Sequence, residues 1–284
     1  MSAKIIDGKV VSAKIKDELK ENICAFKEKY GKDITLAVVL IGEDPASQVY
    51  VRNKIKACEY VGIKSESYVL PADTTQKQAE DLIKELSNND NVTGILVQLP
   101  VPKHLDEDKL LKLIPAKKDV DGFSDENIGK LLQNKDTVIS CTPYGVMELL
   151  KHEDISLKGK NAVIIGRSNI VGKPMACLLL NADATVSVCH SKTKDLKSYT
   201  KNADVLIVAI GRPEFVTGDM IKEGAVVIDV GINRVDGVLK GDVEFESAKQ
   251  VAGYITPVPG GVGPMTIAML MKNTYLTALR NENE

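Results

Sequence analysis

The chain has 284 residues, enough for about two domains that each bury a core without disulfides or a structural metal. Its 37 Lys and Arg residues nearly balance 39 Asp and Glu residues, which leaves a formal charge of -2. This balance excludes a global field that would attract nucleic acid or an anionic membrane surface, and the 4% aromatic content disfavours a base-stacking platform. We therefore expect neither a nucleic-acid partner nor a membrane partner.

The cysteine pattern and the apolar runs bear on the cellular compartment. No run approaches the roughly 18 to 20 apolar residues of a membrane span, and the first 20 residues carry charges where a signal peptide would be apolar. The cysteines are odd in number, scattered and never in a Cys-x-x-Cys pair, so we predict reduced thiols that behave as small buried hydrophobes, no metal site and a cytoplasmic location. These cysteines are Cys24, Cys58, Cys141, Cys177 and Cys189.

Strand-like runs alternate with helical patterns in two series. In the first, strands at 34–42, 63–70 and 92–99 enclose helical patterns at 45–61 and 76–87. Such alternation is typical of βαβ units and a parallel sheet. Several runs are apolar without alternation, which indicates strands covered by helices on both faces.

The second series has strands at 161–166, 184–190, 203–211 and 224–231, with a helical pattern at 172–180. The two series together predict two α/β domains.

A turn-rich segment at 115–145 separates the two series and marks the predicted domain junction. The first domain is expected to span residues 1–122, and the second, Rossmann-like domain to span 140–264. An apolar helical pattern within the segment from about 265 to 284 is expected to pack back on the first domain. A cleft at the junction is the natural place for a ligand.

A glycine turn follows the strand that ends at Gly166 and runs through Arg167 and Ser168 into a helix at Gly172. This order places backbone N–H groups and a helix N-terminus against a pyrophosphate. Ser168 stands where a dinucleotide fingerprint has its second glycine, so an ordinary tight strand-to-helix turn remains open as the alternative.

The end of the next strand indicates which dinucleotide would bind. An NAD site usually offers a carboxylate there to the ribose 2′-hydroxyl, whereas this chain has Ser191 and Lys192. A hydroxyl with Lys192 and Arg167 nearby would hold a 2′-phosphate, so NADP is favoured over NAD. Further glycine turns at Gly211 and Gly231 end later strands, at the edge where open parallel sheets bind ligands.

In the first domain, Tyr50 and Lys54 lie four residues apart and share one face of a predicted helix. Gln98 ends an otherwise apolar strand, and Asp119 and Asp121 bring carboxylates to the junction. A solvated helix face with a snorkelling lysine and a plain Asp-Gly turn are the alternatives for these residues. Short-chain dehydrogenases also space a tyrosine and a lysine by four, but their pair follows the glycine fingerprint, whereas this pair precedes it.

Eight motifs in order resemble the bifunctional methylenetetrahydrofolate dehydrogenase/methenyltetrahydrofolate cyclohydrolase family along nearly the full length. The motifs are SQVYVRNKIKAC, GILVQLPVP, KKDVDGF, SCTPYG, GRSNIVGKPM, ATVSVCHSKT, VIDVGINR and TPVPGGVGPMTIAML. The resemblance implies two α/β domains with a folate cleft between them, NADP as the oxidant, a tetrahydrofolate derivative as substrate and a homodimer. One departure is Ser140, where relatives often have proline.

The resemblance also implies residue roles. Lys54 would be the catalytic amine, with Tyr50 and Gln98 beside the reacting carbon and Asp121 on the pterin amino group. The cofactor would contact Gly166, Arg167, Ser168, Ser191 and Ile232, and the folate would contact Tyr50, Lys54, Gln98, Asp121, Pro259, Gly260 and Gly261.

Three functions remain in competition. A bifunctional enzyme would oxidise 5,10-methylenetetrahydrofolate and hydrolyse the methenyl product to 10-formyltetrahydrofolate. A monofunctional NADP-dependent methylenetetrahydrofolate dehydrogenase would transfer hydride only, and a non-catalytic module would bind the dinucleotide and do neither. Hydride transfer needs mainly alignment, whereas hydrolysis needs general acid/base catalysis, which a partly desolvated lysine amine supplies. The presence of both Lys54 and Gln98 favours the bifunctional enzyme.

Overall fold

The structure is a computed structural model that describes residues 2–283; the outermost positions of the predicted domains, 1 and 284, lie outside the described residues. The chain divides into two compact units. The six-stranded unit comprises Met1–Ser12, Leu131–Lys135 and Ser140–Thr266. The three-stranded unit comprises Ala13–Lys130, Asp136–Ile139 and Ile267–Glu284.

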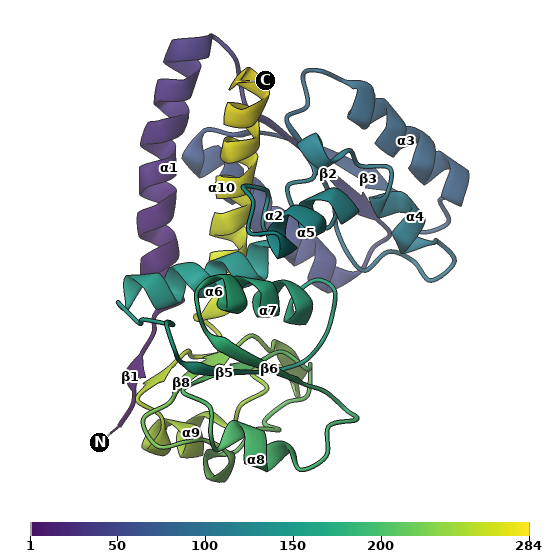
Figure 1. The fold of residues 1–284 in the computed structure, drawn as a ribbon. Helices are drawn as coiled ribbons and strands as arrows, with labels where there is room; N and C mark the ends of the chain where they lie inside the picture. Colours follow the sequence, from purple (N-terminus) through teal and green to yellow (C-terminus); the bar gives the residue numbers. More distant parts are fainter. Residues whose placement is uncertain (1, 284) are drawn as a thin grey trace. The chain divides into compact units, whose positions relative to one another are not determined.

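The six-stranded unit is built on a parallel sheet with strand order β1-β11-β8-β7-β5-β6. Helices α6 (Cys141–His152) and α7 (Gly172–Asn181) cover one face, while α8 (Leu196–Thr200) and α9 (Phe245–Val251) cover the other (Figure 1). The strands in sheet order are β1 (Lys4–Ile5), β11 (Tyr254–Ile255), β8 (Val226–Asp229), β7 (Val205–Val208), β5 (Asn161–Ile165) and β6 (Thr185–Cys189).

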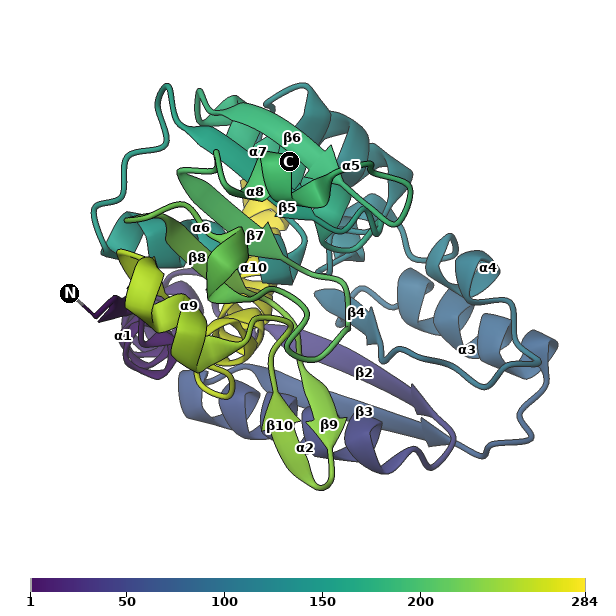
Figure 2. The ribbon, with the colours of Figure 1, turned by 90° about the horizontal axis from the view of Figure 1, so that it is seen from below.

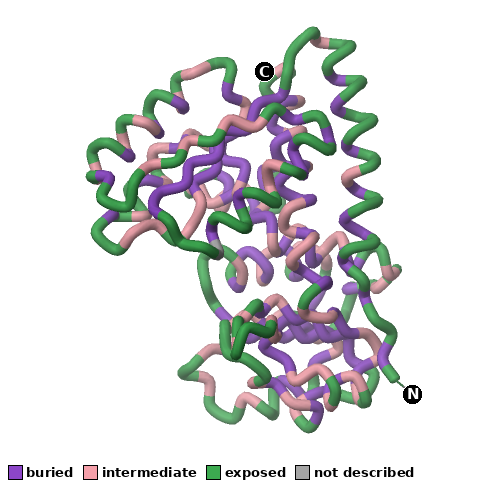
Figure 3. Tube along the Cα trace, turned by 180° about the vertical axis from the view of Figure 1, so that it is seen from behind, coloured by how far each residue is buried: buried purple, intermediate pink, exposed green. Residues whose placement is uncertain are grey.

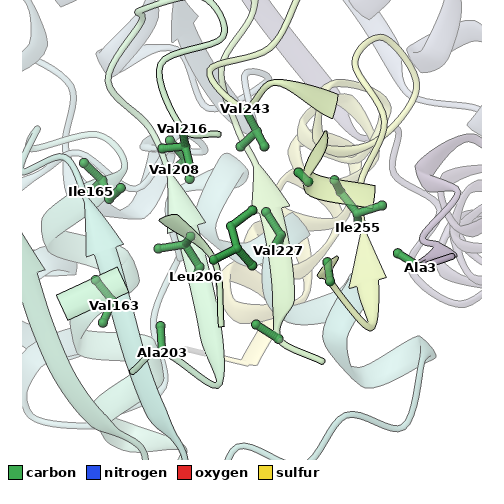
Figure 4. Packing of buried hydrophobic residues seen from close by; sticks show 14 of the residues in the cluster. Ala3, Val163, Ile165, Ala203, Leu206, Val208, Val216, Val227, Val243 and Ile255 are labelled. Atoms are coloured by element: carbon green, nitrogen blue, oxygen red, sulfur yellow. The ribbon is translucent and has the colours of Figure 1, made fainter. Parts of the chain in front are cut away.

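The core of this unit explains why its strands are continuously apolar. Alternate residues of the central strands, such as Val163, Leu206 and Val227, pack on one face of the sheet (Figure 4). The other residues of the same strands are also buried, because helices cover both faces. β5 lies between β6 and β7, so the order of the strands reverses there, and open parallel sheets bind ligands at such a switch point.

The three-stranded unit has the parallel order β3 (Lys64–Leu70), β2 (Thr35–Ile41) and β4 (Gly94–Val97). Every residue of the central strand β2 is buried. The helices α3 (Gln76–Asn88) and α4 (Glu107–Leu111) supply apolar side chains to one core cluster of this sheet. The remaining helix between strands is α2 (Pro45–Val61).

Two long helices, α1 (Gly8–Tyr30) and α10 (Val262–Asn283), run side by side in this unit (Figure 1). The rings of Phe26 and Tyr275 join them, with centroids 6.4 Å apart. Seen from behind, α1 alternates between exposed and buried positions, so it carries one apolar stripe (Figure 3). The other elements are η1 (Ala116–Lys118), α5 (Asp125–Leu132), η2 (Gly218–Met220) and an antiparallel hairpin of β9 (Asn233–Val235) and β10 (Val238–Lys240) that Figure 2 shows.

The predicted fold class, two α/β units with parallel sheets, is confirmed. One part of the chain is placed differently from the interpretation that put residues 1–122 in a single domain. Lys4 and Ile5 form β1, which pairs with β11, so the start of the chain completes the sheet of the six-stranded unit. The reason is a pairing across 250 residues, which local sequence pattern does not reveal.

The cysteines are all free, as expected, and Cys58, Cys141 and Cys189 are buried. Cys24 is exposed, so the expectation of a buried hydrophobe is wrong there. Burial raises the pKa of the Cys58 thiol to about 12 and also raises the pKa of Cys189, which makes both thiols poor nucleophiles. Across residues 2–283, no helix is both long and apolar enough to cross a bilayer.

Candidate active site

Helix α2 carries the first group of predicted site residues. The Asp44 carboxylate accepts the Ser47 N–H at 2.8 Å, and Pro45 occupies the first helical position. The helix ends at Gly62, which adopts the left-handed conformation (φ 90°). This framing places Tyr50 and Lys54 one turn apart on the same face.

Lys54 has a specific partner on the neighbouring strand. Its Nζ donates to Gln98 Oε1 at 2.9 Å, directly after the end of β4. Gln98 Nε2 donates to the Leu99 carbonyl at 2.6 Å, which turns the amide oxygen toward the amine. Lys54 and Gln98 are half-buried, whereas Tyr50 is 40% exposed. Lys54 and Gln98 are thus in direct contact, which weighs against a merely snorkelling lysine.

The two aspartates of the KKDVDGF motif do different things. Asp119 is 4% exposed and accepts N–H bonds from Gly122 (2.9 Å), Ser124 (2.7 Å) and the Asn127 side chain (2.9 Å). It therefore fixes the turn that carries Asp121, which is half-buried. Asp119 anchors the site, and Asp121 stays the predicted ligand.

A bridge to β4 and a side chain of α10 set the course of this turn. Asp119 pairs with Ile95 of β4 in parallel register, which directs the following residues along β4 toward its carboxyl end. Asn273 on α10 donates to the carbonyl of Val120 at 2.9 Å, and Asn273 is itself 1% exposed. Sequence reasoning missed Asn273, because an asparagine inside an apolar helix gives no signal of a partner 153 residues away.

The glycine turn of the six-stranded unit is built by close backbone approach. Gly166 has φ 126°, and a Cβ there would lie 2.2 Å from the Ala209 carbonyl oxygen at the end of β7. A Cβ on Gly172 would lie 2.3 Å from the carbonyl oxygen of Gly166. Both positions therefore require glycine, and they bring the start of α7 against the end of β5 at the switch point of the sheet.

Ser168 and Ser140 shape the loop between these glycines. The Ser168 hydroxyl accepts the N–H groups of Val171 (3.2 Å) and Gly172 (3.4 Å), so it satisfies two backbone donors at the start of α7. The buried Ser140 donates its hydroxyl to the Ile170 carbonyl at 2.7 Å. Sequence reasoning gave Ser140 no contact with the loop, although it identified the position as a departure from relatives.

The end of β6 is closed by a turn in which the Thr193 hydroxyl accepts the His190 N–H at 2.9 Å. Ser191 lies within this turn and is exposed, as are Arg167 and Lys192. With no carboxylate at positions 189–193, this donor set suits a phosphate.

The last predicted contacts lie on two other segments of the six-stranded unit. Ile232 is 44% exposed in the loop after β8. Pro259 is exposed, and Gly260 and Gly261 are buried in the loop before α10. A Cβ on Gly261 would lie 2.7 Å from the Pro257 carbonyl oxygen, so this loop also depends on glycine. Among the described residues, no cluster of three or more His, Cys, Asp or Glu side chains suits a metal ion.

The three-stranded unit contains the hydrogen-bonded Lys54–Gln98 pair. The six-stranded unit contains a glycine turn that leads into a helix N-terminus, with Ser191 and Lys192 just after the next strand. Together they define a two-domain α/β enzyme that binds a nicotinamide dinucleotide.

Comparison with known proteins identifies the family. The family model for the tetrahydrofolate dehydrogenase/cyclohydrolase catalytic domain matches residues 6–121, and that for the NAD(P)-binding domain of the same family matches residues 140–282. The chain belongs to the tetrahydrofolate dehydrogenase/cyclohydrolase family.

Individual relatives match over nearly their whole length. The bifunctional protein FolD of Moorella thermoacetica is 58% identical over 281 residues, which cover 99% of this chain and 100% of that protein. The crystal structure of the FolD methylenetetrahydrofolate dehydrogenase/cyclohydrolase from Campylobacter jejuni has a TM-score of 0.96 and 54% identity, covering 99% of this chain and 100% of that one. The Trypanosoma brucei dehydrogenase-cyclohydrolase, complexed with NADP cofactor and inhibitor, has a TM-score of 0.95 and 40% identity, covering 100% and 99%.

Proposed function

We propose that this enzyme oxidises 5,10-methylenetetrahydrofolate to 5,10-methenyltetrahydrofolate with NADP and hydrolyses the methenyl product to 10-formyltetrahydrofolate in the same cleft. The observation that carries the proposal is the hydrogen bond between Lys54 Nζ and Gln98 Oε1 in a chain of this family. The relatives named bifunctional at 57 to 58% identity support it.

The part of residues 1–122 that lies in the three-stranded unit, together with the segment from about 265 to 284, is proposed to carry the folate chemistry, and residues 140–264 are proposed to bind NADP. Bound NADP supplies the hydride acceptor. The protein's part in this step is to align donor and acceptor, since loss of hydride leaves a resonance-stabilised cation without needing a strong base. Arg167 and Ser191 are proposed to hold the 2′-phosphate, because both are exposed and positions 189–193 contain no carboxylate.

Hydrolysis requires proton transfers that the first step does not. Water attacks the methenyl carbon and loses a proton, the carbon–nitrogen bond to one ring nitrogen breaks, and that nitrogen gains a proton. Lys54 is proposed to move these protons, since its amine is half-buried and held in one orientation by Gln98. Gln98 orients the amine without adding a charge.

Further residues are proposed to contact the folate. Asp121 is proposed to accept from the pterin amino group as a charge-assisted partner, and Tyr50 to lie against the substrate. Pro259, Gly260 and Gly261 are also proposed to contact the folate.

The test compares Lys54→Met with Lys56→Met, an exposed lysine two residues along the same helix. Lys54→Met keeps the apolar stem and removes the amine. We expect its cyclohydrolase rate to fall about 100-fold or more, the usual scale for losing a general acid/base. Dehydrogenase activity should remain measurable, so the absorbance of methenyltetrahydrofolate accumulates. Lys56→Met should retain both activities.

The same assay separates the competing functions. A wild-type chain that reduces NADP but never consumes methenyltetrahydrofolate faster than buffer would be a monofunctional dehydrogenase. A chain that binds NADP with neither activity would be a binding module. Hydrolysis at the unmutated rate in folded Lys54→Met would remove Lys54 from the mechanism.

A homodimer and a cytoplasmic location complete the proposal. Strand β6 forms one edge of the six-stranded sheet, and an uncovered edge invites pairing with another chain. Val188 on β6 and Leu180 at the end of α7 are exposed by 38% and 59%. Leu132 is 64% exposed, and its neighbour Leu131 accepts a bond from Asn181, next to Leu180.

The proposed cytoplasmic location rests on the cysteines, since free thiols at every cysteine suit a reducing compartment.

A further inference from the structure

Two buried carboxylates occupy the carboxyl edge of the six-stranded sheet and have no part in the chemistry above. Asp229 ends β8 and is 3% exposed, and Asp242 follows the β9–β10 hairpin and is 0% exposed. Within the described part of the chain, no salt bridge from Lys or Arg reaches either one. Burying a charged group without a counter-ion costs free energy unless hydrogen bonds offset that cost. The N–H groups that bond to each carboxylate are therefore the part of the structure that it holds in place.

Asp242 gathers the loop after β7. Its two oxygens accept three successive backbone N–H groups, from Ile210 (2.7 Å), Gly211 (2.9 Å) and Arg212 (2.8 Å). Successive N–H groups that converge in this way form an anion-binding concavity, which here is filled by the protein's own carboxylate. A fourth bond, at 2.9 Å, comes from the side chain of Asn233, the first residue of β9.

Asp229 in turn holds Asp242 and the start of the loop after β8. It accepts the N–H groups of Gly231 (2.9 Å), Asp242 (3.0 Å) and Val243 (2.9 Å). Two glycines leave room for the pair: a Cβ on Gly231 would lie 2.2 Å from Asp242 Cγ, and one on Gly241 would lie 1.9 Å from Asp229 Oδ2. The two carboxylates and the loops are therefore one interlocked network.

Ile232 lies between two residues that bond to the carboxylates of this network. Its predecessor Gly231 is bonded to Asp229, and its successor Asn233 is bonded to Asp242. Both neighbours are thus fixed, while the Ile232 side chain is 44% exposed at the edge where parallel sheets bind ligands. An exposed apolar side chain on so firmly held a backbone is suited to contact a ligand rather than to fill a core.

We propose that Asp229 and Asp242 are positioning residues for the dinucleotide: through their N–H bonds they hold the 210–212 and 231–233 loops in the conformation that receives NADP. The proposal rests on the proposed function in taking NADP as the ligand of this edge. Neither carboxylate is proposed to touch the cofactor, because the groups that donate to them all belong to the protein.

The test uses Asp242→Asn, with Asp204→Asn as the matched control. Asp204 also accepts a backbone N–H in this unit, from Asn161 at 2.8 Å, but it precedes β7 and lies at the amino edge of the sheet. For each folded variant the measurements are the Kd of NADP, the KM for NADP and kcat of the dehydrogenase, and the hydrolysis of supplied methenyltetrahydrofolate, which consumes no NADP.

For Asp242→Asn we expect the Kd and KM for NADP to rise at least tenfold, kcat at saturating NADP to stay within about threefold, and hydrolysis to stay within about twofold. Asp204→Asn should leave all four values near wild type. Asn233→Ala removes one hydrogen bond to Asp242 without removing a charge, so it tests the proposal if Asp242→Asn does not fold. The Kd of this variant for NADP should rise about threefold or more.

An unchanged Kd in the folded variants would overturn the proposal, and so would a parallel loss of NADP binding and hydrolysis, which would mean a general structural role. A wild-type protein that fails to bind NADP would instead overturn the proposed cofactor, and the wild-type measurement alone separates that outcome.

Discussion

Asp119 and Asp121 stand two positions apart in the same motif, but only Asp119 is seen to accept the N–H bonds that hold the turn, and Asp121 is proposed to bind the folate. Asp121→Ala should weaken folate binding in both activities by roughly 2 to 4 kcal/mol, because a charge-assisted partner is lost from one shared pocket. Its melting temperature should stay close to that of wild type. Asp119→Ala should lower the melting temperature instead, since three N–H donors lose their acceptor. Paired thermal melts and Michaelis constants for both activities measure the contrast; equal melting losses would assign both residues to the turn.

Asp229 makes the stability of the protein depend on pH. Burial raises the pKa of this carboxyl to about 7, and the neighbouring Asp242 carboxylate also raises it, although three backbone N–H bonds oppose the shift. Because the folded pKa lies above the ordinary value of 3.8, the stabilisation is complete below about pH 4 and is lost as the pH rises through about 7.

The free energy of unfolding should therefore lose about 2 kcal/mol from this group between about pH 5.5 and pH 8. Asp229→Asn does not titrate, so the difference between wild type and variant should shrink by that amount over the same interval. Urea unfolding of both proteins at the two pH values measures it. A difference that stays constant with pH would place the titration elsewhere.

At the scale of elements, two serines hold the loop from Arg167 to Val171: the Ser168 hydroxyl accepts the Val171 N–H, and the Ser140 hydroxyl donates to the Ile170 carbonyl. Ser140→Ala removes the bond from the buried hydroxyl and should raise the KM for NADP about fivefold, equivalent to about 1 kcal/mol for one hydrogen bond. Hydrolysis of methenyltetrahydrofolate should not change. Ser198→Ala, which removes an exposed hydroxyl bonded to the Asp195 carbonyl, is the control and should leave KM unchanged. A KM unaffected by Ser140→Ala would make Ser140 a helix-start residue only.

The elements also show how far sequence reasoning reaches. The runs at 34–42 and 203–211 contain β2 and β7, because strands buried on both faces must be apolar throughout. Helix α1 is absent from the predicted elements although its signal is present: Val11, Ile15 and Leu19 recur every four residues along its buried side. β1 and β11 have two residues each, too few for any period to show.

The features of the site also separate into those that the sequence predicts and those that it does not. The glycine turns and the position of Gln98 at a strand end follow from residue type and strand order, so the sequence predicts them. The Asp229 and Asp242 network and Asn273 do not, because their partners are chosen by loop geometry; 30 to 32 residues separate Asp242 from the loop it holds. A buried aspartate at a strand end reads equally well as a turn residue.

At the scale of the whole molecule, the proposed dimer can be tested on the edge strand. Leu180→Asp places a charge on the exposed apolar surface beside β6 and should shift the mass in solution from twice 30.8 kDa toward 30.8 kDa. Val238→Asp alters an equally exposed valine (60%) on β10 and should leave the mass unchanged. Light scattering coupled to gel filtration gives both values. Wild type at 30.8 kDa would contradict the dimer, and an unchanged mass for Leu180→Asp would move the interface away from this edge.

The discontinuity of the two units has a consequence for synthesis on the ribosome. β1 at residues 4–5 cannot pair until β11 at 254–255 has been made, and the other unit lacks half of its long helix pair until α10 emerges. The nascent chain must therefore carry apolar segments without their final partners for most of its elongation, a period in which exposed apolar surface favours aggregation. We therefore expect β1 and α10 to reach their final partners last, and a ribosome that stalls before β11 and α10 are made would leave both units incomplete.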